Sequence, residues 1–121
     1  MKIYKHRHFY QWAKKEKLKD EQLKEAITEI VAGLHDGDLG NGLYKKRISQ
    51  PGKGKRGSYR TLLAFKAGHK AFFVYGFAKK DLANINEKEQ YTYRQLAKYL
   101  LAADEKVIQK MLDDHSLIEV K

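Results

Sequence analysis

Basic side chains are concentrated in the middle third of the chain, where they could bind a polyanion and stabilise negative charge on phosphate oxygens. Residues 43–80 contain 11 Lys and Arg residues and no Asp or Glu. By contrast, residues 1–42 contain 8 basic and 7 acidic residues, and residues 81–121 contain 6 and 8. Because like charges on one surface repel, such a segment indicates an anionic ligand, and nucleic acid is the leading class. A basic surface that only aids solubility is the alternative.

The predicted strands and their connecting loop bring several of these cations to one surface. In an extended strand, Lys45 and Arg47 point to one face and Lys46 to the other. Arg60 falls in the next strand of the sequence. Arginine offers a planar fork that matches phosphate oxygens, whereas lysine supplies a compact point charge. We therefore expect Lys46 to contribute to RNA binding, together with three cations of the glycine-rich loop: Lys53, Lys55 and Arg56.

Aromatic residues are interleaved with the cations in the same segment, and exposed rings could stack on unpaired bases. Strand alternation predicts Phe73, Tyr75 and Phe77 on one face, and one of the two faces must be core. Tyr59 and Tyr75 are the predicted base-stacking residues, because each carries a hydroxyl group that suits a hydrated face.

Other classes of chemistry lack the residues that they need. The sequence has no cysteine, which excludes disulfides, thiolate catalysis and Cys-type zinc sites. Its five histidines are scattered and form no metal-ligand motif, so we predict neither a metal nor another cofactor. Asp36 and Asp38 lie in a turn-rich stretch and are predicted to be turn residues. The glycine-lysine pattern is not a phosphate-binding P-loop, because Arg56 follows Lys55 where that motif has Ser or Thr.

The length of 121 residues suits one domain spanning residues 1–121. No apolar run approaches the ~20 residues that a membrane span needs. The N-terminal segment lacks the apolar middle of a secretory signal. We therefore expect a cytoplasmic protein without a membrane partner.

Hydrophobic periodicity predicts an α+β domain. Apolar residues at helical spacing predict helices over 8–17, 21–34 and 86–102 and a short last helix, with Asp20 as the N-cap of the second helix and Asp104 as the N-cap of the last. Strands are expected over 43–48, 59–65 and 70–77, with a loop over 50–57 and a turn over 66–69. Short strands at residues 2–4 and 117–120 complete the pattern. We expect a three-stranded antiparallel meander plus the short N-terminal strand, with helices packed on one face and the other face free to bind.

The central motifs resemble the RelE/HigB toxins of bacterial type II toxin–antitoxin systems. The similarity is carried by Asp38–Ile48, by Pro51–Leu62 with its Gly-Lys-Gly-Lys-Arg-Gly loop, and by Phe72–Lys79. It is closest to the HigB-like branch and extends over nearly the whole chain. The resemblance implies a RelE-like fold and a ribosome-dependent mRNA endonuclease, or mRNA interferase, that blocks translation and is inhibited by a cognate antitoxin.

The resemblance also implies which residues act. In this family the RNA's own 2′-hydroxyl attacks the neighbouring phosphate. Arg60 matches the strand arginine that contacts the scissile phosphate, Lys45 and Arg47 match the preceding basic strand, and Lys79 and Lys80 match the basic pair after the last strand. Relatives of the RelE type carry a catalytic tyrosine shortly after that pair, and residues 82–86 contain none. A non-catalytic RNA-binding module and a gyrase-inhibiting toxin of the ParE type are therefore the alternatives.

Overall fold

The described strands form one six-stranded sheet in the order β2-β3-β4-β5-β1-β6. The computed structural model describes residues 1–50, 54–78 and 85–121, and for residues 50 and 54–57 it describes the backbone alone. The strands are β1 (Lys2–His6), β2 (Gly37–Gly40), β3 (Leu43–Gln50), β4 (Gly54–Lys66), β5 (Lys70–Ala78) and β6 (Leu117–Glu119). Neighbouring strands are antiparallel except that β1 runs parallel to β5.

This architecture confirms the predicted α+β class with an antiparallel β3–β4–β5 meander, and it enlarges the sheet. Gly37–Gly40 adds a strand at one edge, where the sequence predicted only turns. The N-terminal strand lies between β5 and β6 and is therefore internal, not at an edge. The predicted loop over 50–57 is shorter than expected, because β4 begins at Gly54, which pairs with Gln50.

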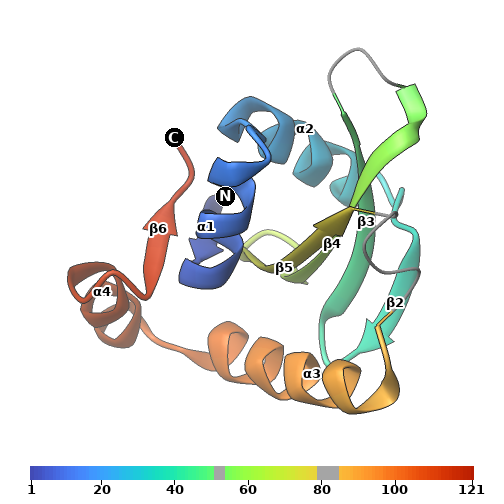
Figure 1. Cartoon of the computed structure of the whole chain (residues 1–121). Coiled ribbons are helices and arrows are strands. Elements are labelled where there is room, and N and C mark those ends of the chain that lie inside the picture. The colour runs from blue at the N-terminus through green and yellow to red at the C-terminus, as the bar shows by residue number, and fades with distance from the viewer. Residues whose placement is uncertain (51–53, 79–84) are drawn as a thin grey trace.

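Helices cover both faces of the sheet, so the expectation that they pack on one face only is wrong (Figure 1). The helices α1 (Arg7–Lys15) and α2 (Asp20–Val31) bury Phe9, Leu23 and Ile27 in one apolar cluster. The helices α3 (Glu87–Ala102) and α4 (Glu105–Asp113) pack against a second cluster on the opposite face.

The apolar strands explain why both faces are covered. Leu62 and Leu63 are neighbours in β4 and point to opposite faces, yet each is at most 1% exposed. A strand that is apolar on both sides is stable only when both sides are shielded from water. The surface left for a ligand is therefore a part of one face and not a whole face.

A β-bulge changes which aromatic residues of β5 share a face. The pairing steps from Leu62 opposite Tyr75 to Leu63 opposite Phe73, so β5 contains one extra residue. Such an insertion reverses the alternation beyond it. Phe73 therefore packs with α1 and α2, whereas Tyr75 and Phe77 pack on the α3 face. The prediction that all three share one face is wrong for this reason.

Two helix N-termini were predicted with their caps, with different outcomes. Asp104 accepts a hydrogen bond from the Val107 N–H at 2.9 Å and caps α4 as expected. Asp20 is instead the first residue of α2, whose N-cap is Lys19. The Asp20 carboxylate accepts from Lys5 Nζ at 2.7 Å and from the Lys121 N–H at 2.8 Å. It ties the N- and C-terminal segments together in place of capping.

Close packing between α1 and the sheet generates a stability prediction. A Cβ atom placed on Gly76 would lie 2.3 Å from Cζ3 of Trp12, well inside van der Waals contact. We expect Gly76→Ala to lower the free energy of unfolding by about 1–3 kcal/mol, the usual cost of overpacking. Urea denaturation measures it. The same glycine change in a Trp12→Ala background should cost much less, and equal costs in both backgrounds would contradict this packing.

Candidate nucleic-acid interface

A cleft of about 230 Å³ lies near the β2 edge of the sheet. It is lined by residues of β3 and β4 and by Asp36, which comes just before β2. Arg47 of β3 and Arg60 of β4 are directly opposite one another in the antiparallel pairing, so their side chains share a face. Lys45 is two residues before Arg47 and points to the same face. The residues that line the cleft are Asp36, Lys45, Lys46, Arg47, Arg60 and Thr61.

Three of the residues predicted to act on a phosphate thus meet in one place. They come from two adjacent strands, and the sheet fixes their relative positions. The Arg47 side chain is 53% exposed, and that of Arg60 is half-buried with its Nε atom shielded from solvent. Lys45, Arg47 and the partly shielded Arg60 together provide a concave site of positive charge, which suits a phosphodiester group.

Among the described residues that line the cleft, one is acidic, and the sequence analysis did not predict its place there. The Arg47 N–H donates to Oδ2 of Asp36 at 2.7 Å, and Arg47 Nε donates to Oδ1 at 3.2 Å. The sequence predicted Asp38 as a turn residue too, but it lies in β2 and pairs with Tyr44, while its Oδ1 accepts from the Gly40 N–H at 3.0 Å. Nothing in the local sequence separates the two aspartates, because only the pairing of β2 with β3 brings Asp36 beside Arg47.

Although Lys46 is among the residues that line the cleft, its side chain lies on the opposite face of β3, as alternation predicted. Its Nζ atom is 2.7 Å from Oε1 of Glu29 in α2, and the residue is 8% exposed. A buried ammonium group needs such a partner, because burial without one is costly. The expected contribution of Lys46 to RNA binding therefore has no support from its position: its charge is already neutralised by α2.

Tyr59 does not lie on a hydrated face, and that expectation is wrong. Its ring is 5% exposed and makes an edge contact with Trp12, with ring centroids 5.2 Å apart. Its hydroxyl group donates to the Glu16 carbonyl at 2.9 Å. Burial raises the pKa of this hydroxyl, and the Glu16 charge raises it further. Tyr59 is therefore a core residue on the α1–α2 side of the sheet. Burial of its ring is favourable, and its hydroxyl group keeps a hydrogen-bond partner inside the protein.

Tyr75 lies on the cleft-bearing face, but α3 covers part of it. Its ring stacks on that of Tyr93 with centroids 5.0 Å apart. Burial raises the pKa of Tyr93 to about 12, with smaller contributions from Tyr75 and Glu89, so this phenol keeps its proton at neutral pH. Stacking of Tyr75 on a base stays a prediction, because its ring already contacts those of Tyr93 and Phe77.

The remaining predicted cations are only partly within the structure. Lys53, Lys79 and Lys80 lie outside the described residues. Lys55 and Arg56 belong to β4, where the backbone alone is described. Their predicted roles therefore stay predictions, and the described part of the site consists of Lys45, Arg47 and Arg60 with Asp36.

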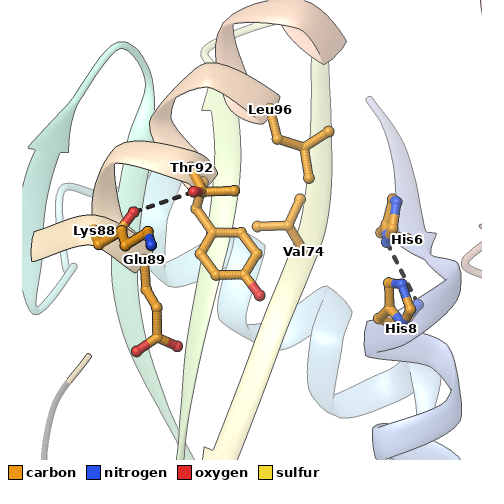
Figure 2. A pocket seen from close by; sticks show the side chains of 8 residues that line it. His6, His8, Val74, Lys88, Glu89, Thr92 and Leu96 are labelled. Atoms are coloured by element: carbon orange, nitrogen blue, oxygen red, sulfur yellow. Dashed lines mark hydrogen bonds between the residues drawn. The ribbon is translucent and has the colours of Figure 1, made fainter. Parts of the chain in front are cut away.

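A second and larger cavity, of about 380 Å³, lies between α3 and the junction of β1 with α1 (Figure 2). Val74 and Leu96 contribute apolar surface, and His6 and His8 face them from the other side. Burial lowers the pKa of His6, with smaller effects from His8 and Arg7, so its imidazole is neutral at neutral pH. Among the described residues that line it, Lys88 is the only lysine and there is no arginine. The described lining of this cavity therefore lacks the cluster of cations that a nucleic-acid backbone requires.

Within the described ranges, no three His, Cys, Asp or Glu side chains are grouped so that they could hold a metal ion. None of the helices in the same ranges is long and apolar enough to cross a membrane.

Comparison with known protein families extends over almost the whole chain. A family model described as "RelE toxin of RelE / RelB toxin-antitoxin system" matches residues 1–120. The match includes every residue that lines the cleft. A search of curated proteins found none that matches the chain.

Lys46 and Arg47 provide a matched pair for testing which face meets RNA, because they are adjacent and carry the same charge. We expect Arg47→Ala to weaken binding of a short single-stranded RNA and to reduce the slope of log K against log salt by about 0.7, the value for one phosphate contact. Fluorescence anisotropy at several salt concentrations measures this slope.

Lys46→Ala should leave that slope unchanged and instead lower the free energy of unfolding by about 1 kcal/mol, because it removes the ion pair with Glu29. The effect is expected to be modest, since the Glu29 side chain is partly exposed. Equal reductions in slope for the two variants would contradict the assignment of faces.

Proposed function

Because this chain belongs to the RelE toxin family of toxin–antitoxin systems, we propose that it is an endoribonuclease that cleaves mRNA on the ribosome and so blocks translation. The observation that carries the proposal is the convergence of Lys45, Arg47 and Arg60 in one cleft. Membership of the family implies a cognate antitoxin as partner. The ribosome and its bound message are the proposed target.

The proposed reaction uses chemistry that the RNA itself supplies. The 2′-oxygen attacks the adjacent phosphorus, the bond to the 5′-oxygen breaks, and a 2′,3′-cyclic phosphate and a 5′-hydroxyl group result. Negative charge builds on the phosphate oxygens in the transition state. Preorganised cations stabilise this charge more strongly in a shielded site than in water, because no solvent has to reorient.

The roles follow from position. Arg60 has its Nε atom shielded from solvent and is proposed to contact the scissile phosphate. Lys45 and Arg47 line the same cleft from the neighbouring strand and are proposed to hold the flanking backbone. Lys79 and Lys80 keep the catalytic roles that the resemblance implies, outside the described residues. Lys53, Lys55 and Arg56 are proposed to extend the RNA contact along the β3–β4 hairpin.

A non-catalytic RNA-binding toxin is the second candidate, and one feature of the sequence favours it. Residues 82–86 contain no tyrosine where RelE-type relatives have a catalytic one. Such a protein would use the same cations to occupy the ribosome without cutting the message. The two candidates differ in whether new RNA ends appear.

Mapping of message 5′ ends after brief induction of the chain without its antitoxin tests the proposal. We expect growth arrest together with new 5′ ends inside translated messages. Arg60→Ala should lower the cleavage rate by about 10²–10³-fold, the usual loss for one electrostatic donor. Ribosome binding should be largely retained.

Lys98→Ala serves as the control for charge, because Lys98 is an exposed lysine on α3 outside the cleft. It should cleave like the unaltered chain. Growth arrest without any new 5′ ends would contradict the nuclease and favour the non-catalytic candidate.

A further inference from the structure

Asp36 makes two hydrogen bonds to a single residue of the cleft. Its Oδ2 accepts from the backbone N–H of Arg47 and its Oδ1 accepts from Nε of the same side chain, at 2.7 and 3.2 Å. The backbone bond fixes the carboxylate relative to β3, and the Nε bond then fixes the guanidinium relative to the carboxylate. In the free chain the Arg47 guanidinium is thus bonded to Asp36.

The segment that carries Asp36 is itself held in place. The Asp36 N–H donates to the Lys45 carbonyl at 2.9 Å. The neighbouring His35 ring lies against Tyr44, with centroids 5.0 Å apart, and Tyr44 in turn packs on Phe65 at 6.1 Å. The carboxylate therefore belongs to an ordered support and not to a free loop end.

The next residue of the segment accommodates a second cation of the cleft. A Cβ atom on Gly37 would lie 3.0 Å from Cε of Lys45, tighter than ordinary contact. The Lys45 side chain thus lies across the backbone of Gly37, in space that a larger residue would occupy. Residues 35–37 support both cations that β3 directs into the cleft.

The repulsion between two arginines explains why Arg47 needs this support. Arg47 and Arg60 are paired directly across two strands, and like charges in that position repel. Without a restraint, the more exposed Arg47 would swing into solvent, since a long side chain gains rotamer freedom there. A carboxylate on its Nε side offsets the repulsion and leaves the guanidinium charge within the cleft.

We propose that Asp36 is a positioning residue that orients the Arg47 guanidinium toward the phosphate of a bound RNA. This inference rests on the proposed function for its substrate, while the restraint on Arg47 is independent of it. Asp36 acts through Arg47 and does not itself touch the reacting atoms. The competing role is that of the proton acceptor for the 2′-hydroxyl, in which Asp36 would act without Arg47.

A double-mutant cycle separates these roles. Cleavage of a message on purified ribosomes is measured under single-turnover conditions for the full chain and for Asp36→Ala, Arg47→Ala and the double variant. We expect Asp36→Ala to slow cleavage about 10- to 100-fold, since small misplacements of a positioned group have effects of this size. In the Arg47→Ala background the same change should have little further effect.

Asp38→Ala is the matched control, because Asp38 lies two residues away and, among the contacts described, its side chain bonds only to the Gly40 N–H. It should cleave at the rate of the unaltered chain. A full additional loss on Asp36→Ala in the Arg47→Ala background would overturn the positioning role and indicate the proton acceptor.

A second measurement does not depend on cleavage. The Nε–H resonance of Arg47 in the free chain should be shifted and protected from solvent exchange, and Asp36→Ala should abolish both effects. An unchanged Arg47 resonance would overturn the proposal whatever the cleavage rates are. If the resonance changes as expected but the unaltered chain cuts no RNA, the proposed function fails and the restraint on Arg47 stands.

Discussion

The direct pairing of Arg47 with Arg60 across β3 and β4 is the constraint on which the site depends. Two like charges held opposite each other destabilise the ladder that carries them. The segment from 43 to 80 contains no acidic residue that could relieve this repulsion. Relief must therefore come from other parts of the chain or from a ligand, and Asp36 supplies part of it at Arg47.

Two acidic residues from outside this segment contact cations of β3. Glu29 from α2 neutralises Lys46 on the buried side, where an unpaired charge would be costly. Asp36 meets Arg47 on the open side, where the side chains of Lys45 and Arg60 lie as well. Strand alternation alone sends neighbouring residues to these different environments. A residue's place in the alternation, and not its charge, decides whether it stabilises the fold or serves the site.

Much of the fold and part of the site followed from the sequence, and the misses have physical causes. Helical and strand periodicity located the β3–β4–β5 meander and the helices, and alternation placed Lys45 and Arg47 together. The parallel insertion of β1 beside β5 is a long-range pairing that no local pattern encodes. The bulge between β4 and β5 reversed the faces of Phe73 and Tyr75, and only the strand partner reveals it. Asp36 was missed because its role depends on such a partner as well.

The repulsion within the cleft also links binding to stability. A ligand that binds only the folded chain stabilises it in proportion to its affinity. A polyanion bound at Arg47 and Arg60 would bring negative charge to a pair of cations whose repulsion Asp36 offsets at Arg47. An antitoxin that covers the cleft with acidic side chains would act on the same pair. Substrate and inhibitor would thus compete for the same cations, and a chain with further acidic residues beside β3 would bind both less tightly.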